Sequence, residues 1–125
     1  MNNDLPIFSK PTIHPTGWGE ERHIFNGPEY CGKILYFKKG AMFSDHFHAK
    51  KESFLILRGT IIFKYYNLKT AERLERELSK GDVITIPPFI PHQVLALEET
   101  EIAEFSTQDF PDGSYRIGKG DSQIT

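Results

Sequence analysis

The stretch GAMFSDHFHAKKESFLILRG, residues 40–59, places two histidines and a glutamate between two glycines. Because side chains two positions apart on a strand point to the same face, His46 and His48 point together if this stretch is extended. Glu52 has the same parity and opens the next strand, so a bend between them can bring its carboxylate to the two imidazoles. Two neutral imidazoles and a carboxylate are good ligands for iron, manganese, nickel, copper or zinc. The stretch therefore predicts part of a metal site.

A fourth candidate ligand follows a proline-rich turn in GDVITIPPFIPHQVLA, residues 81–96. Residues 83–86 have the composition of a strand, and the cluster of prolines after them predicts a tight, rigid turn. His92 then opens the returning strand. A rigid turn beside a ligand makes physical sense, because a metal site has to be held in shape before the metal arrives.

Short runs of β-branched and aromatic residues, each bounded by Gly, Pro, Asn or charge, fill the chain from Lys33 onward. They are KILYFKK, ESFLILR, TIIFKYYN, DVITIPP, HQVLALE and TEIAEFST. Evenly spaced short strands of this kind predict an all-β sandwich or barrel.

The segment LKTAERLERELSKG, residues 68–81, interrupts this pattern. Ala71, Leu74 and Leu78 have helical spacing, with good helix formers between them. Leu74, Arg76 and Leu78 also alternate as a strand would. We favour a charged hairpin because it suits the surrounding strands, and a helix is the alternative.

The strands that carry the candidate ligands are apolar on both faces. If Glu52 points inward, alternation predicts that Phe54 and Ile56 do too, and His92 predicts the same of Val94 and Ala96. The opposite faces carry Leu55, Leu57 and Leu95. Strands buried on both faces need a second covering layer. In a chain this small, part of that layer is expected to be a second subunit, which predicts a homodimer.

Composition divides the chain into three parts. Residues 1–30 are rich in Pro, Gly, His and Asn and predict an irregular N-terminal arm that packs on the barrel, with Trp18 docking it by its ring. Residues 31–107 form the barrel. Residues 108–125 are polar and glycine-rich and predict a C-terminal strap across the barrel with a frayed tail.

Length, charge and cysteine content argue against several classes of protein. The 125 residues predict one domain with a real core. A net charge of −2 and a pI of about 6.2 offer no electrostatic case for a nucleic-acid partner. No apolar run approaches membrane-spanning length, so no membrane partner is expected. The chain has one cysteine, Cys31, so no internal disulfide can form. We expect Cys31 to be a small, buried hydrophobic side chain. Without a basic, apolar leader the expected location is the cytoplasm.

The two histidine-bearing stretches resemble the motifs of the cupin superfamily. The first motif is matched at each fixed residue by Gly40, His46, His48, Glu52 and Gly59. The second is resembled by Gly81, Pro87, Phe89 and His92. The resemblance implies a single-domain cupin jelly-roll barrel. It also implies that one divalent transition metal ion, whether zinc, manganese, iron or nickel, is held by His46, His48, Glu52 and His92.

Two positions depart from the second cupin motif. Phe89 stands where the family usually has glycine, and Ala96 stands where it usually has asparagine. Neither position is a metal ligand in the family. The departures therefore leave the four implied ligands in place and leave open the conformation of the turn and the surroundings of the site.

The whole chain is similar to small single-domain cupins labelled mannose-6-phosphate-isomerase-like. The similarity rests on the W-G lead-in, CGKIL, GDVITIP and SYRIGKGDS. It implies a small polar substrate, such as a sugar phosphate or related carbohydrate, with the metal as a Lewis acid. Type II isomerases of this group carry glutamine in place of His46. That departure gives weight to two alternatives, a non-haem dioxygenase and a non-catalytic small-molecule binding module.

Several other polar residues are candidates without an assigned role. An isomerase needs a base, for which the candidates are Tyr36, Lys38, Tyr65 and Glu104. Phosphate binding needs cations, for which the candidates are Lys50, Lys51, Arg58 and Arg116. No catalytic residue is predicted among them. Asp45 either supports its neighbour His46 or lies on the surface. His14 and His23 are expected to be solvated.

Overall fold

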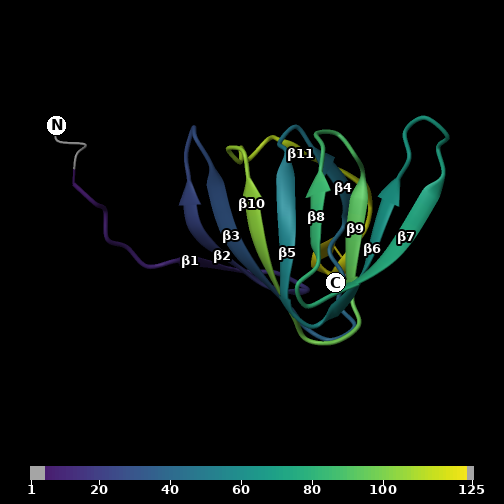
Figure 1. Ribbon diagram of the computed structural model, residues 1–125, viewed down its shortest axis with the longest axis horizontal. Helices are drawn as coiled ribbons and strands as arrows, with labels where there is room; N and C mark the ends of the chain where they lie inside the picture. Colours follow the sequence, from purple (N-terminus) through teal and green to yellow (C-terminus); the bar gives the residue numbers. More distant parts are fainter. Residues whose placement is uncertain (1–4, 124–125) are drawn as a thin grey trace.

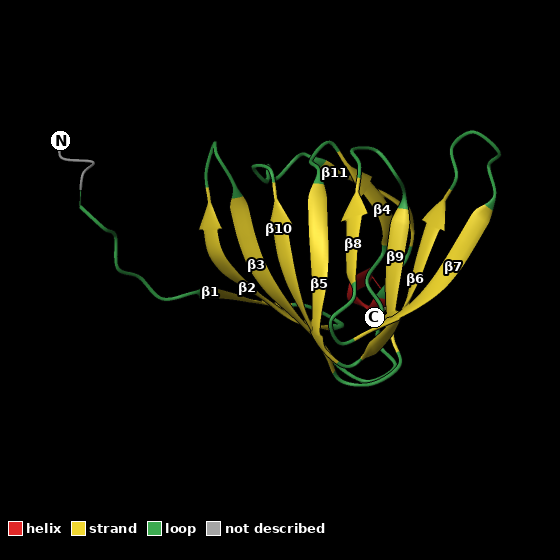
Figure 2. Cartoon of the chain, viewed as in Figure 1, coloured by secondary structure: helices red, strands yellow, loops and turns green. Residues whose placement is uncertain are grey.

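The computed structural model describes residues 5–123 and contains two antiparallel sheets (Figures 1 and 2). In sheet order, the six-stranded sheet contains β1 (Thr12–Pro15), β2 (Gly19–Asn26), β3 (Cys31–Phe37), β10 (Thr100–Ser106), β5 (Glu52–Arg58) and β8 (Val83–Ile86). The five-stranded sheet contains β11 (Ser114–Gly118), β4 (Asp45–His48), β9 (His92–Ala96), β6 (Thr60–Tyr66) and β7 (Arg73–Ser79). A 3₁₀ turn, Asp121–Gln123, follows β11. The predicted all-β jelly-roll architecture is confirmed.

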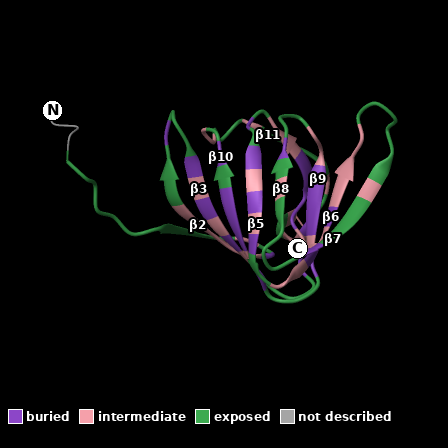
Figure 3. Cartoon of the chain, viewed as in Figure 1, coloured by how far each residue is buried: buried purple, intermediate pink, exposed green. Residues whose placement is uncertain are grey.

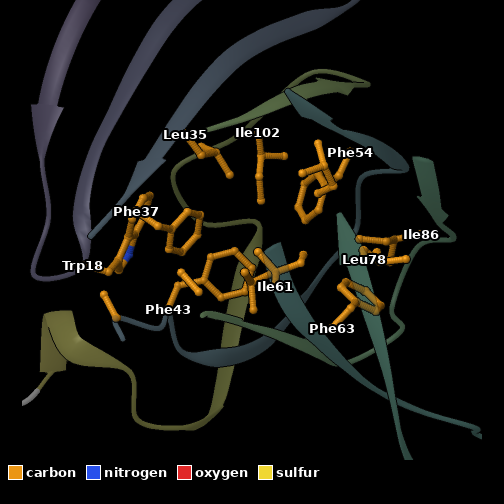
Figure 4. Packing of buried hydrophobic residues seen from close by; sticks show 14 residues of the cluster. Trp18, Leu35, Phe37, Phe43, Phe54, Ile61, Phe63, Leu78, Ile86 and Ile102 are labelled. Atoms are coloured by element: carbon orange, nitrogen blue, oxygen red, sulfur yellow. The ribbon is translucent and has the colours of Figure 1, made fainter. Parts of the chain in front are cut away.

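Alternation along the strands places the core between the two sheets (Figures 3 and 4). Phe54 and Ile56 of β5 are buried, as are Val94 and Ala96 of β9, which confirms their predicted inward orientation. The core cluster also contains Leu35, Phe37, Phe43, Ile61, Phe63, Leu78, Ile86 and Ile102. Each such side chain stabilises the fold by roughly 1.5–3 kcal/mol when it is fully buried.

The lead-in to the barrel is more regular than its composition predicts. Trp18 is buried and stacks on Phe37, with ring centroids 4.3 Å apart, so its predicted docking role is confirmed. The expected irregular conformation is wrong for residues 12–15 and 19–26, because β1 and β2 extend the six-stranded sheet beyond β3. Hydrogen bonding to a neighbouring strand has overridden weak local preferences. The division of the chain at residues 30 and 107 stays a prediction.

The charged segment 68–81 forms a hairpin, as favoured, and not the alternative helix. β7 pairs with β6 in continuous register from Tyr66↔Arg73 to Thr60↔Ser79. Leu78 is buried in the core, so the strand alternation decides the structure over the helical spacing.

The C-terminal segment lies along the five-stranded sheet. β11 pairs with β4 at its edge, and the carboxylate of Asp121 accepts a hydrogen bond of 2.8 Å from the backbone N–H of Met42. The predicted frayed tail falls partly on residues 124–125, and the start of the predicted arm falls on residues 1–4. These six residues lie outside the described part of the chain.

Candidate metal centre

The four predicted ligands converge between the two sheets. His46 and His48 lie on β4, His92 opens β9 and is paired with His46, and Glu52 opens β5 in the other sheet. The ligand nitrogens of the three histidines lie within 4.8 Å of one another. The Oε1 atom of Glu52 lies 3.1 Å from Nε2 of His48 and 3.0 Å from Nε2 of His92. The structure therefore brings all four side chains together.

Backbone carbonyls fix the orientation of two of the imidazoles. Nδ1 of His46 lies 2.5 Å from the carbonyl oxygen of Ser44, and Nδ1 of His92 lies 2.9 Å from that of Ile90. A carbonyl only accepts, so Nδ1 donates in both rings. Each neutral ring then keeps its lone pair on Nε2, which is the arrangement that metal-ligating histidines usually have.

The buried polar atoms of this cluster fit a cation. Among residues 5–123, Nε2 of His92 and both carboxylate oxygens of Glu52 are buried without a hydrogen-bond partner. In a neutral His92 whose Nδ1 donates, the Nε2 lone pair faces a carboxylate oxygen only 3.0 Å away. Two facing acceptors repel each other unless a cation lies between them. A divalent ion held by these residues would remove this conflict, so the residues fit such an ion.

Burial and mutual repulsion adjust the protonation of the site. Burial, together with the neighbouring His92 and His48, lowers the pKa of His46 to about 3, so that its ring is neutral at pH 7. Burial alone would raise the pKa of Glu52, but the imidazoles of His48 and His92 outweigh it and hold that pKa well below its usual value. A neutral imidazole and an ionised carboxylate are the forms that bind a metal.

The turn that leads to His92 adopts the conformation expected of glycine, although it carries phenylalanine. Phe89 has a φ of 68°, in the left-handed region, and its backbone N–H donates a hydrogen bond of 2.7 Å to the carbonyl of His48. This conformation costs a non-glycine residue roughly 1–2 kcal/mol. The second departure from the cupin motif, Ala96, is fully buried in the core.

Asp45 lies beside the site and is not a surface residue. It is 4% exposed, and its Oδ2 atom lies 2.9 Å from Nη1 of Arg73 on β7. Arg73 also donates a hydrogen bond to the side-chain oxygen of Gln93 on β9. The ion pair thus connects β4 to the far edge of its sheet and supports the strand that carries His46.

A cavity of about 320 Å³ opens beside the cluster, and its opposite wall is charged. On that wall His23, Lys33 and Glu104 lie opposite one another on β2, β3 and β10. Cross-strand partners share a face of the sheet, and all three residues border the cavity. The inner face of the six-stranded sheet is therefore polar where it borders the cavity and apolar where it packs in the core.

Ion pairs join the charges of this wall. Nζ of Lys50 lies 2.9 Å from Glu104 and 3.7 Å from Glu52, and Nζ of Lys33 lies 2.9 Å from Asp109. Burial raises the pKa of Glu104 to about 7, with a contribution from the charge of Glu52, while Lys50 opposes the shift. The neighbouring carboxylates raise the pKa of Lys50 despite its burial. Glu104 therefore exchanges its proton near neutral pH beside a fixed positive charge.

The structure separates the remaining sequence candidates. Glu104, Lys50 and Arg116 border the cavity. Tyr36, Lys38 and Arg58 line a different depression. Tyr65 packs partly buried against the core, and Lys51 is exposed.

Sequence reasoning overlooked Lys33 and Asp109. Lys33 lies two positions before the inward-facing Leu35 on the same strand, so strand periodicity could have indicated that Lys33 also points inward. Asp109 lies in the loop after β10, and no pattern in the sequence indicated it. His14 is exposed as expected. His23 is half-buried, borders the cavity and lies 2.7 Å from Glu21, so the expectation of a solvated His23 is wrong.

Comparison with known families identifies the class. The family model of the cupin domain matches residues 33–107, so the chain belongs to the cupin domain family. It carries a three-histidine cluster suited to a divalent metal ion. No curated protein sequence matches the chain. Over residues 5–123, no helix is long and apolar enough to cross a membrane.

Solved structures share the fold at low sequence identity. Oxalate decarboxylase from Bacillus subtilis matches with a TM-score of 0.78 and 14% identity, over 90% of this chain and 33% of that chain. The capsular polysaccharide assembling protein CapF from Staphylococcus aureus matches with a TM-score of 0.75 and 19% identity, over 89% and 33%. This chain thus spans about a third of these relatives, and the likeness establishes the fold alone. A further structure of the same decarboxylase concerns its Mn(II) centres.

Proposed function

We propose that this protein is a metal-dependent cupin that acts on a small polar metabolite, most simply a sugar phosphate or related carbohydrate, in an isomerase- or epimerase-type reaction. The ion would be held by His46, His48, Glu52 and His92. When bound, it supplies a Lewis acid for a substrate carbonyl or hydroxyl. The observation that carries the proposal is the cavity between this cluster and a wall of paired charges.

The charged wall suits a substrate rich in hydroxyl groups. Lys33 and Lys50 donate hydrogen bonds, and Glu104 and Asp109 accept them, so neighbouring hydroxyls find partners of both kinds. Arg116 borders the same cavity and is exposed, so it is free to pair with a phosphate. At about 320 Å³, the cavity is at the small end of the roughly 300–1,000 Å³ of ligand pockets, which favours a small metabolite.

Glu104 is the residue that we assign to proton transfer. Its carboxyl group is buried, borders the cavity and touches Lys50, so it can take a proton from the carbon beside a carbonyl and return it. Lys50 holds Glu104 in place and also approaches Glu52. Trp18 and Phe54 contribute apolar surface to the same cavity and help to exclude water.

Deuterium exchange tests this assignment. The protein, loaded with one equivalent of metal, is incubated with a panel of sugar phosphates in D₂O, and NMR follows deuterium at the carbon beside the carbonyl. We expect exchange with at least one substrate. Glu104→Gln should abolish exchange and leave metal content unchanged. A Glu104→Gln variant that exchanges at the wild-type rate would refute the role of Glu104.

The second candidate function is a non-haem dioxygenase, which is favoured by His46 at the position where type II isomerases carry glutamine. Oxygen uptake separates the two reactions, because an isomerase is indifferent to O₂. About one equivalent of iron after anaerobic purification, with substrate-dependent O₂ uptake, would establish the dioxygenase. A ligand that raises the melting temperature without turnover would establish the third reading, a binding module.

The narrower assignments are also proposals. We propose the mannose-6-phosphate-isomerase-like subtype and a role in carbohydrate metabolism, which the name of the polysaccharide assembling neighbour suits. We propose a cytoplasmic location on the ground that Cys31 is a free, buried thiol. We propose a homodimer on the ground that the outer surface of the six-stranded sheet is apolar at Leu57, Val83 and Phe105.

A further inference from the structure

The segment of residues 114–123 lines one side of the cavity and belongs neither to the metal cluster nor to the charged wall. It contains β11 and the 3₁₀ turn that is drawn red in Figure 2. Because cross-strand partners share a face, the β11 residues opposite His46 and His48 point to the cavity side of their sheet. They are Arg116 and Ser114, and both border the cavity. β11 therefore places a guanidinium and a hydroxyl beside the ligand set.

Close contacts and hydrogen bonds fix the 3₁₀ turn between the β1–β2 turn and the residues before β4. A Cβ atom at Gly17 would collide with the backbone of Asp121, and one at Gly120 would collide with the backbone of Phe43. Only glycine allows these two approaches. The carboxylate of Asp121 accepts from the N–H of Met42, and the N–H of Asp121 donates to the carbonyl of Met42. The turn is thus built into the barrel, and its carboxylate is occupied by the backbone.

The other polar side chains of the turn are left as hydrogen-bond donors at the cavity, which Ser122 and Gln123 both border. The hydroxyl oxygen of Ser122 accepts a bond of 2.9 Å from the N–H of Gly17, so its own hydrogen remains to donate. The side-chain oxygen of Gln123 accepts a bond of 2.9 Å from the N–H of Gly120, which leaves its NH₂ group to donate. In the described part of the chain, Arg116 takes part in no ion pair. This side of the cavity therefore offers donors and a positive charge.

The carboxylates that border the cavity all lie on the other side, on the six-stranded sheet and in the loop after β10. They are Glu21, Glu52, Glu104 and Asp109. The two lysines of that wall are already paired, Lys33 with Asp109 and Lys50 with Glu104, each at 2.9 Å. An anion in the cavity is therefore attracted to the side of Arg116, where no carboxylate opposes it.

We propose that β11 and the 3₁₀ turn form a subsite for the phosphate group of the substrate. Its members are Arg116, Ser114, Ser122 and Gln123. The inference rests on the proposed function and adds to it the place of the phosphate and the residues of the turn. The guanidinium, two hydroxyls and an amide donate more hydrogen bonds than the roughly four that a carboxylate accepts. A phosphate, with three strongly accepting oxygens, uses more of them and pairs with the fork of an arginine.

The subsite also fixes the direction in which the substrate lies. Its phosphate binds at Arg116, the cross-strand partner of His46. Glu104, assigned to proton transfer, lies on the opposite wall, so the carbon chain of the substrate extends from β11 toward that wall. Inorganic phosphate fills the subsite alone and is therefore a probe of it.

Binding of inorganic phosphate to the chelator-treated protein tests the subsite without metal or turnover. Titration calorimetry should give one site per chain, and acetate should bind at least about tenfold more weakly. Arg116→Gln removes the arginine fork and should weaken phosphate binding about tenfold or more, as expected for a hydrogen bond to a charged group. Lys119→Gln is the matched control, because Lys119 is an exposed cation of the same segment that does not border the cavity. It should leave phosphate binding unchanged.

Gln123→Glu tests the contribution of the turn. The new carboxylate still accepts the hydrogen bond from the N–H of Gly120, so the turn keeps its contact, but a negative charge replaces the donor. Phosphate binding should fall about tenfold or more. An unchanged melting temperature without phosphate shows that the turn is intact in this variant.

The outcomes separate the subsite from the proposed reaction. A wild type that does not bind phosphate would overturn the subsite, as would Arg116→Gln and Gln123→Glu variants that bind it like the wild type. Acetate that binds as tightly as phosphate would overturn the choice of phosphate. Phosphate binding that depends on both residues, without deuterium exchange in any sugar phosphate, would uphold the subsite and refute the reaction.

Discussion

The metal site predicts that His48→Ala yields a folded protein that has lost most of its affinity for metal. His48 is the best position for this test, because its side chain borders the open cavity and is 13% exposed. Removing it widens the cavity and leaves no closed void. His92 is a poorer choice, because it is 1% exposed and its ring stacks near Phe63 with centroids 5.8 Å apart. Removing the His92 side chain would weaken core packing as well as metal binding, so the two effects on stability could not be separated.

The size of the effect follows from linkage between binding and folding. Metal at 1,000 times its dissociation constant stabilises the folded state by about 4 kcal/mol. For a domain of this length, that is a rise in melting temperature of roughly 12–20 °C. Removing a residue that only hydrogen-bonds to a metal ligand typically lowers metal affinity 10–100-fold. Removing a ligand itself should therefore lower metal affinity about 100-fold or more. The metal-induced rise in His48→Ala should therefore shrink by at least roughly 8 °C.

Calorimetric melting of wild type and His48→Ala, each with chelator and with manganese or zinc, measures this difference. Metal content by mass spectrometry gives the stoichiometry. His14→Ala is the matched control, because His14 is an exposed histidine outside the cluster. A folded His48→Ala protein that binds one equivalent with wild-type affinity would show that His48 is not a ligand and would refute the four-residue assignment.

Three further substitutions test the surroundings of the site. Glu104 has a folded pKa of about 7 against an ordinary 4.5, so its stabilising effect is complete below pH 4.5 and lost as pH rises to 7. In the metal-free protein, urea unfolding should show the wild type losing about 3 kcal/mol relative to Glu104→Gln over that range, and parallel pH profiles would contradict it. Arg73→Leu strands the buried Asp45 and should lower the unfolding free energy by about 2 kcal/mol. Adding Asp45→Asn to the Arg73→Leu variant should restore most of this lost stability. Equal stability of the Arg73→Leu single variant and this double variant would argue against the ion pair. Phe89→Gly relieves a left-handed φ and should raise the free energy of unfolding, measured in denaturant, by about 0.5–1 kcal/mol. A lower free energy of unfolding would show instead that the Phe89 ring stabilises the turn.

Most of the fold could be predicted because its strands carry strong local signals. The alternation around Phe54 and Val94 predicted the faces that the structure buries. The strands within residues 12–26 were predicted poorly because they depend on pairing, of β1 with β2 and of β2 with β3, and not on their own local propensity. The sequence GEERHIFN of β2 is mostly polar, and only its neighbour supplies the hydrogen bonds that hold it extended.

The candidate site divides in the same way. The candidate ligands were singled out by their spacing in two short stretches, and the resemblance to the cupin motifs joined them into one set of four. The charged wall was only partly predicted. Glu104 and Lys50 were named among many candidates, and their pairing joins positions 54 residues apart. Asp109 reaches Lys33 across 76 residues, a contact that no local pattern encodes.

The arrangement of the strands separates the two tasks, metal binding and substrate binding, that the proposed function requires. The three histidines stand on β4 and β9 of one sheet, while Glu52 stands on β5 of the other, so an ion held by all four would join the sheets. Most of the wall that would face the proposed substrate comes instead from β2, β3, β10 and the loop after β10. Lys50 approaches both Glu52 and Glu104, so it links the ligand set to the wall. On the proposed function, the residues that would hold the metal and most of those that would face a substrate thus belong to different strands, and Lys50 connects the two sets.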